Sequence, residues 1–243
     1  MRLRRNIIIL VLSTLSLGTF AQEAMNRPYI DDRLYHFGFQ VGMNFTAFGV
    51  TDRDTTVRID NDGRLYEPHA RVSSVLPGVH VNFIADLRLS KHVNLRFCPG
   101  IQFSERTLKY KLYSGNDTIT RVANALAIPI NFPLYLKFSA DRQSNYRPYV
   151  IAGGGVSLNA YQDKNKPIML KVFDAFCEVG FGVDFYLPWF KLCPELTYRI
   201  GFMDLLCPIS EHEGGTLSKN DYFYTDAISR LTSHCICLTF NFE

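Results

Sequence analysis

The sequence predicts an all-β fold: an eight-stranded antiparallel up-and-down transmembrane β-barrel with a filled polar interior. Three observations predict this class. Apolar and polar side chains alternate with a period of two in eight segments of the 243-residue chain, a secretory signal precedes them, and no apolar run is long enough for a transmembrane helix. A strand with this alternation has one apolar and one polar face, as the wall of a barrel in a bilayer requires.

Residues 1–21 have the features of a cleaved signal peptide. Three arginines precede the apolar run of residues 7–17, and cleavage is expected after Ala21. The apolar run is too short to span a bilayer as an uncleaved anchor. The full chain has a formal net charge of +3, and residues 1–21 contain three arginines and no acid, so the mature chain is neutral. A neutral chain gives no reason to expect nucleic acid as a partner.

A short lead-in precedes the strands. We expect residues 22–34 to be an irregular periplasmic lead-in and residues 35–243 to be the barrel. The first four strands are predicted at 35–49, 75–89, 92–110 and 121–139 from the apolar sets Tyr35 to Ala47, Val75 to Leu89, Val93 to Phe103 and Val122 to Phe138. The last four are predicted from the sets Val150 to Leu158, Phe173 to Leu187, Phe190 to Phe202 and Ile236 to Phe242. The fifth strand, at 147–160, is rich in glycine and has the weakest alternation.

Short and long connections alternate along the chain. Ser90-Lys91 and Pro188 mark tight turns, 140–146 is short, 111–120 and 161–171 are of medium length, and 50–74 and 205–226 are long. This alternation is typical of outer-membrane barrels, so we expect a cell outer membrane location with both termini periplasmic and the long loops extracellular. In the first long loop, residues 55–66 predict a hairpin around Asp62-Gly63. Asp60-Asn61-Asp62-Gly63 lacks the further ligands of a calcium loop and is interpreted as a turn.

The soluble alternative is a lipocalin-like barrel with its apolar face inward, which alternation alone does not exclude. Aromatic residues near the short-turn ends of the strands favour the membrane, because they match an interfacial girdle. This predicted girdle consists of Tyr35, Phe138, Tyr149, Tyr186, Trp189, Phe190, Phe240 and Phe242. Outer-membrane lipid is therefore an expected partner.

Some residues do not fit the simple alternation. Glu105, Lys109, Arg230 and His234 fall on the nominal lipid side, all toward the long-loop ends, where charge costs little. Four prolines remove ladder donors within strands, and we expect β-bulges at them. These are Pro99, Pro129, Pro133 and Pro194.

Charged residues on the inner faces are the most specific polar feature. The acids are Asp86, Asp174, Glu178, Asp184 and Glu195, and the bases are Arg88, Arg96, Arg106, Lys137, Lys191 and Arg199. The interior of an eight-stranded barrel is just wide enough for side chains to fill, so buried charges there must pair. We expect a salt-bridged structural core; the functional alternative is a narrow ion path or a gated plug.

The six cysteines are Cys98, Cys177, Cys193, Cys207, Cys235 and Cys237. Their expected compartment permits disulfides, and their spacings match no standard zinc module. Cys235, Cys237 and Cys193 are predicted on the inner face of adjacent strands, so a Cys193–Cys237 bridge is conceivable, although we prefer to interpret them as small wall residues. Cys177 should face lipid and be free.

A lipid-modifying barrel enzyme would need histidine with serine and an acid. His80 and Asp86 share a face, but six residues along a strand span about 20 Å. His36, His80 and His92 are interpreted as lumen or rim residues. We therefore expect no catalytic, cofactor-binding or metal-binding residues, no cofactor and no small-molecule substrate. The long loops, including residues 211–225, are the expected recognition surface.

Several segments resemble the small outer-membrane barrel family that includes PorT and SprT. They are FGFQVGMNF (37–45), IPINFPLYLKF (128–138), RPYVIAGGGVSLN (147–159) and EVGFGVDFYLPWFKLCPELTYRIGFMDLL (178–206). The resemblance implies an accessory component of the type IX secretion system, which exports proteases and other cargo with C-terminal signal domains and supports gliding in related cells. It implies other secretion-system proteins as partners. A filled eight-stranded barrel would not itself be the conduit.

Overall fold

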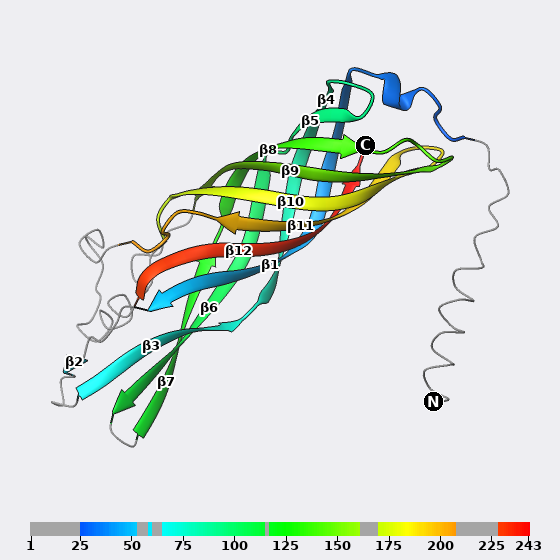
Figure 1. Cartoon of the computed structure of the whole chain (residues 1–243). Coiled ribbons are helices and arrows are strands. Elements are labelled where there is room, and N and C mark those ends of the chain that lie inside the picture. Colours follow the sequence, from blue (N-terminus) through cyan, green and yellow to red (C-terminus); the bar gives the residue numbers. More distant parts are fainter. Residues whose placement is uncertain (1–24, 53–57, 60–64, 115–116, 161–169, 208–227) are drawn as a thin grey trace, which may run out of the picture.

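The computed structural model describes residues 25–52, 58–59, 65–114, 117–160, 170–207 and 228–243. The predicted signal peptide, the Asp62-Gly63 turn and the loop segment 211–225 lie outside these residues. The described strands pair antiparallel and close into a ring of eight, which confirms the predicted fold class (Figure 1). No helix in the described part of the chain is long and apolar enough to cross a membrane.

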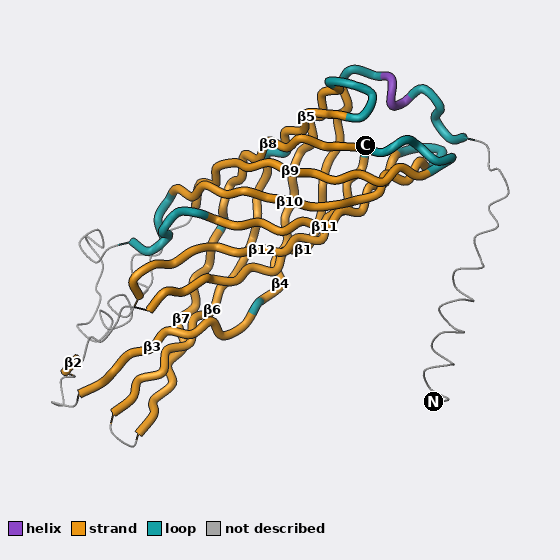
Figure 2. The backbone as a smooth tube through the Cα atoms, viewed as in Figure 1, coloured by secondary structure: helices purple, strands orange, loops and turns teal. Residues whose placement is uncertain are grey.

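Each ladder of the ring joins neighbouring strands, and β1 closes it by pairing with both β12 and β4. The ring strands are β1 (Tyr35–Asp52), β4 (Leu76–Arg88), β5 (Val93–Phe97) continued by β6 (Gly100–Ser114), β8 (Pro129–Ser139), β9 (Tyr146–Asn159), β10 (Phe173–Tyr186), β11 (Lys191–Gly201) and β12 (Ile228–Phe242). Figure 2 shows these strands wound obliquely around one axis. We call the end with the short connections the turn end and the opposite end the loop end.

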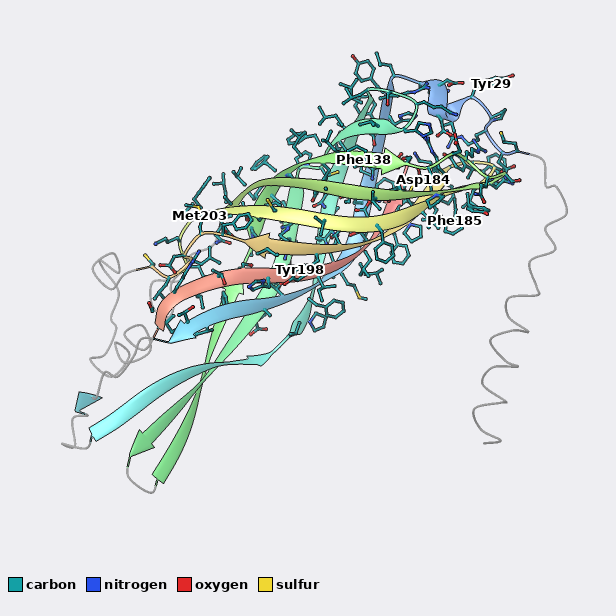
Figure 3. The ribbon with its side chains drawn as sticks, in the orientation of Figure 1. Tyr29, Phe138, Asp184, Phe185, Tyr198 and Met203 are labelled. Atoms are coloured by element: carbon teal, nitrogen blue, oxygen red, sulfur yellow. The ribbon has the colours of Figure 1, made fainter. Side chains whose placement is uncertain are left out.

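The two faces of the wall follow the predicted alternation. Phe37 is 63% exposed and Phe181 is 59% exposed on the outside, whereas Asn44 on the inner face is fully buried. Phe138, Phe185 and Tyr198 also lie on the outer surface (Figure 3). The outer surface is therefore apolar and aromatic, and the polar side chains fill the interior.

Two predicted strands are each broken into two elements. The predicted strand 92–110 is interrupted at Cys98-Pro99, which separates β5 from β6, and the predicted strand 121–139 is interrupted at Ile128. Pro99 and Pro129 lie at these interruptions, so breaks replace the predicted bulges. The medium loop predicted at 111–120 is also wrong, because β6 runs to Ser114 and β7 (Asp117–Ala127) begins three residues later.

The long loop predicted at 50–74 contains further strands. β2 (Arg58–Ile59) pairs with the start of β3 (Leu65–Ser74), as the hairpin predicted at 55–66 requires, and β3 then pairs with β6. β6 pairs with β7 on its other side beyond Ser104. The resulting three-stranded sheet of β3, β7 and the outer half of β6 extends past the ring at the loop end (Figure 1). We call it the projecting sheet.

The remaining proline and girdle predictions are partly corrected. The ladders through Pro133 and Pro194 keep their register, so neither residue forms a bulge. The exposed aromatic residues of the predicted girdle lie outside as expected: Tyr35, Phe138, Trp189, Phe190 and Phe240. Phe242 stacks on the outward Phe39 with ring centroids 4.9 Å apart.

The prediction that Tyr149 and Tyr186 belong to the girdle is wrong, because both side chains are buried in the interior. Tyr149 lies opposite Gly182 in the β9–β10 ladder. A Cβ at Gly182 would lie 2.5 Å from the Tyr149 ring, so only glycine leaves room for the inward ring. The inward direction also supplies both phenols with carboxylate partners.

Candidate functional site

The interior is filled by one network of buried charges. Its centre is the fully buried Arg96 of β5. Arg96 Nε donates to Asp86 Oδ2 at 2.9 Å, and Nη2 donates to Glu243 Oε1 at 2.6 Å. Nη1 lies 3.5 Å from Glu195 Oε2. One guanidinium thus faces three carboxylates from three parts of the ring, which offsets the large cost of burying its charge.

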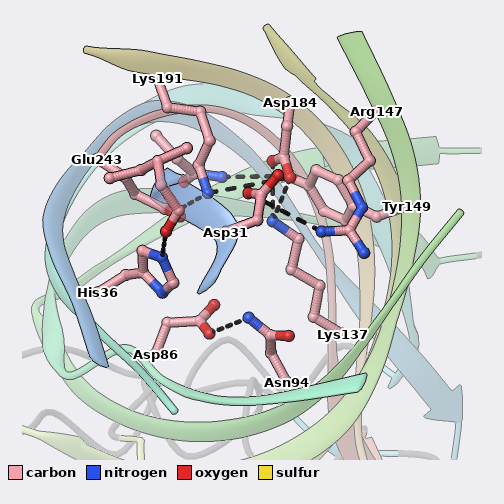
Figure 4. Close-up of polar contacts among 12 residues, drawn as sticks. Asp31, His36, Asp86, Asn94, Lys137, Arg147, Tyr149, Asp184, Lys191 and Glu243 are labelled. Atoms are coloured by element: carbon pink, nitrogen blue, oxygen red, sulfur yellow. Dashed lines mark hydrogen bonds and ion pairs between the residues drawn. The ribbon is translucent and has the colours of Figure 1, made fainter. Parts of the chain in front are cut away.

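A second group of charges lies toward the turn end (Figure 4). Lys137 Nζ donates to both carboxylate oxygens of Asp184 at 2.8 Å and lies 4.0 Å from the centroid of the Tyr149 ring. Lys191 Nζ lies 4.0 Å from Asp184 Oδ2 and forms an ion pair with Glu243. Each ammonium therefore has an anionic partner, and Asp184 is shared by two of them.

A third group lies around Glu178 of β10. Arg199 Nε donates to Glu178 Oε2 at 2.8 Å, and the Tyr135 hydroxyl donates to the same oxygen at 2.9 Å. The Arg199 guanidinium lies 4.0 Å from the centroid of the Phe176 ring. The buried charges of Arg199 and Glu178 are therefore compensated by their ion pair, by the tyrosine hydrogen bond and by the cation–π contact.

Most of the predicted inward charges are brought together, which confirms the salt-bridged core. Arg88 is an exception, because it lies at the turn-end rim and pairs with the exposed Asp32 at 3.1 Å. Asp174 is buried, and the side chain of Arg106 lies outside the described ones. Sequence reasoning missed Glu243. It is the next residue after Asn241 with inward period-two spacing, and this was the signal that could have identified it.

An apolar layer closes the loop end of the lumen. Phe48 of β1 points inward, although the alternation predicted a polar face there, and it packs with buried residues from other elements. The cluster consists of Phe48, Ala127, Leu170, Leu205, Ile228 and Leu231. Apolar side chains packed without polar partners exclude water, so this end is sealed by a hydrophobic plug.

The lead-in closes the turn end. Ile30, in a short 3₁₀ turn (η1, Ile30–Asp32), is buried, and its carbonyl oxygen lies 2.8 Å from His36 Nε2. The Tyr186 hydroxyl lies 2.9 Å from both oxygens of Asp31. Asn26 bonds to Asn145 and to the Tyr186 carbonyl. These contacts hold residues 26–32 across the mouth of the barrel.

A small polar cavity remains between the two closures. It is lined by amides, charged groups and a thiol: Gln40, His80, Asn82, Gln102, Asn131, Tyr135, Glu178, Glu195, Arg199, Cys237 and Thr239. Its volume of about 20 Å³ has room for roughly one water molecule. Among the described residues, this cavity is therefore far too small to hold a polypeptide.

The predicted histidines lie in the lumen or at the rim. His80 Nε2 lies 3.1 Å from the Thr239 hydroxyl, and His92 lies near Asp141 at the turn end. Among the described residues, no serine hydroxyl bonds to a histidine ring, so the set needed by the enzyme alternative is not brought together. The described side chains also contain no group of three or more metal-ligating residues.

Cys98, Cys177, Cys193, Cys235 and Cys237 are free thiols, and Cys177 is exposed on the outer face as predicted. The structure excludes the Cys193–Cys237 disulfide that the sequence left open. Cys193 lies opposite Asn241 in the β11–β12 ladder, four residues from Cys237. Four strand residues span about 13 Å, which no disulfide can bridge.

Comparisons with known proteins identify one matching family and two similar solved structures. The family model described as outer membrane protein beta-barrel domain matches residues 20–206. The crystal structure of Neisserial surface protein A (NspA) is similar at 10% identity and a TM-score of 0.41, covering 85% of this chain and 97% of that chain. OprG from Pseudomonas aeruginosa is similar at 10% identity and a TM-score of 0.35, covering 92% and 96%. No curated protein matches the chain.

The family match spans well over half of the chain, including the charged lumen from Arg96 to Arg199. The chain belongs to the outer membrane protein beta-barrel domain family and is a β-barrel of the cell outer membrane.

Proposed function

We propose that this protein is a non-enzymatic accessory component of type IX protein secretion. The proposal rests on the resemblance of residues 37–45, 128–138, 147–159 and 178–206 to the PorT and SprT barrels. The observation that carries the mechanism is the filled lumen, closed by the apolar cluster at one end and the lead-in at the other. A wall of this kind serves export by holding partners, not by conducting cargo.

In this proposal both termini are periplasmic and the long loops are extracellular, as the lengths of the connections favour. Two surfaces are then available to partners. The lead-in lies at the periplasmic mouth, and the projecting sheet lies beyond the ring on the cell exterior. Other secretion-system proteins would bind at these surfaces or at the lipid-facing wall.

A clean deletion with plasmid complementation tests the role. We expect the deletion to abolish secretion of a protease that carries a C-terminal signal domain, with the unprocessed precursor held in the periplasm. Complementation by the wild-type chain should restore secretion. Normal secretion in the deletion strain would overturn the proposal.

Planar bilayers test the mechanism separately. The purified barrel should give no large, stable conductance, because charged side chains and an apolar layer fill its lumen. A large, stable conductance would show a conduit and contradict the accessory role.

A surface adhesin or structural barrel is the second candidate. The projecting sheet favours it, because β3, β6 and β7 place regular structure beyond the ring, where a host or matrix ligand could bind. The same deletion strain separates the two functions. Normal secretion with altered adhesion would support this second candidate.

A further inference from the structure

Two cysteines of the inner wall lie unusually close together. Cys235 and Cys237 are both buried on β12, and their Sγ atoms are 3.4 Å apart. Residues two apart on a strand point to the same face. We propose that Cys235 and Cys237 form a reversible intrastrand disulfide in the lumen wall.

The geometry allows this bond with strain. Two residues of separation along a strand correspond to about 6.6–6.8 Å between Cα atoms, at the upper end of the range that a disulfide spans. The two thiols already point toward each other, so bridging requires a local shortening of β12 and no new side-chain direction. Strained disulfides are more easily reduced than structural ones, which makes the bond reversible.

Neighbouring strands hold the pair in place. Cys235 lies between Thr46 of β1 and Arg199 of β11, and its Sγ is 3.7 Å from the Thr46 hydroxyl. Cys237 lines the polar cavity. Because β12 is paired on both sides, neither cysteine can move to another partner without breaking ladders. The described cysteine nearest to Cys237 along the adjacent strand, Cys193, is out of reach.

The bond forms by thiol–disulfide exchange before the barrel closes, while the chain crosses an oxidising compartment, and the folded β12 then keeps the two sulfur atoms adjacent. One cysteine thiolate attacks the disulfide of a thiol–disulfide oxidoreductase and releases one of its thiols. The second cysteine then attacks the mixed disulfide and releases the other thiol. The pair loses two electrons and two protons, and the oxidoreductase leaves as a dithiol.

Trypsin isolates the pair cleanly. No lysine or arginine follows Arg230, so residues 231–243 form one peptide that contains Cys235 and Cys237 and no other cysteine. The protein is extracted from outer membranes with acid quenching, alkylated in denaturant without reductant, and digested. We expect this peptide to carry no alkyl group and to lack the mass of two hydrogen atoms. After reduction with dithiothreitol it should carry two alkyl groups.

Variants distinguish the pair from other thiols. In Cys237→Ser, residue 235 should become alkylated without reductant, whereas the matched lumen variant Cys193→Ser should leave the 231–243 peptide oxidised. Heat-modifiable migration in gels reports whether each variant folds into a barrel. If a variant does not fold, the mass of the wild-type 231–243 peptide still shows whether the disulfide is present. The same measurement is made on wild-type protein from membranes and on wild-type protein refolded with oxidised glutathione. If the unreduced peptide carries two alkyl groups in both preparations, the proposal is overturned. A bridge from this peptide to another cysteine would also overturn it.

Discussion

At the scale of single residues, the lumen depends on how each buried charge finds its partners. Arg96 faces Asp86, Glu195 and Glu243, and all four side chains are almost completely buried. Removing one partner of a buried pair leaves the others charged, without water and without compensation. The charged network therefore determines whether the interior tolerates a given substitution.

Replacing Arg96 with methionine should lower the free energy of unfolding by about 3–5 kcal/mol, since the three carboxylates lose their shared cation. Guanidinium titration of the barrel in phospholipid vesicles measures the change. Arg230→Met is the matched control, because Arg230 is exposed and, among the described residues, its side chain donates only to the Phe202 carbonyl. It should cost no more than about 1.5 kcal/mol. Equal effects of the two substitutions would contradict a charge-dependent core.

At the scale of elements, the lead-in and β12 close the two ends of the barrel. The lead-in docks through polar contacts, and β12 contributes Ile228 and Leu231 to the apolar cluster. Neighbouring residues of one element differ sharply in role. Asp31 contacts Tyr186, Arg142 and Arg147, whereas Asp32 is exposed and contacts only the rim residue Arg88 among described side chains.

Asp31→Ala should release the lead-in. Loss of charge-assisted hydrogen bonds worth about 1.5–3 kcal/mol should raise tryptic cleavage after Arg33 by about tenfold or more. The rate of appearance of the shortened barrel by mass spectrometry measures this. Asp32→Ala should leave the rate nearly unchanged, because exposed ion pairs contribute little. Equal cleavage rates in the wild type, Asp31→Ala and Asp32→Ala would show that Asp31 does not hold the lead-in against the barrel.

Leu231→Ala should open a cavity in the loop-end plug and cost about 2–5 kcal/mol of unfolding free energy, since Leu231 is fully buried. Leu238→Ala on the same strand is the comparison. Leu238 lies on the outer face, where lipid fills the space left by the lost methyl groups, so its cost should be smaller. Denaturant unfolding in vesicles measures both. The reverse order of costs would contradict a packed plug.

At the scale of the whole molecule, the barrel turns its apolar face outward to lipid and its charged face inward. Val179 is 55% exposed in the middle of β10, between the charged residues Glu178 and Asp184 of the inner face. A soluble lipocalin-like barrel would have the opposite arrangement. This inversion is the physical basis of the membrane location.

Val179→Arg should destabilise the barrel in vesicles by about 2–4 kcal/mol, because it places a charge near the middle of the bilayer. Ser229→Arg, at an exposed outer position near the loop end, should cost about 0–1 kcal/mol. Unfolding titrations in vesicles measure both effects. Similar small costs at the two positions would mean that this outer wall does not face hydrocarbon.

The sequence predicted the parts that depend on local periodicity. The eight-strand ring, the outward apolar sets and the pairing of Arg96, Lys137 and Arg199 with inward acids all follow from period-two alternation. The alternation did not predict β3, because a paired strand that extends past the ring needs no apolar face. It also misplaced Tyr149, since only its position opposite Gly182 makes room for an inward ring.

The sequence alone therefore determined the fold class and the contents of the lumen, because alternation and charge burial are properties of each strand by itself. Only the tertiary structure decided that both ends are closed, that Glu243 joins the network and that Cys193 lies out of reach of Cys237. These depend on register between strands and on which segments lie across the ends of the ring. The contacts of Asp31 with Tyr186 and of Arg96 with Glu243 join residues more than a hundred positions apart, so no local pattern encodes them.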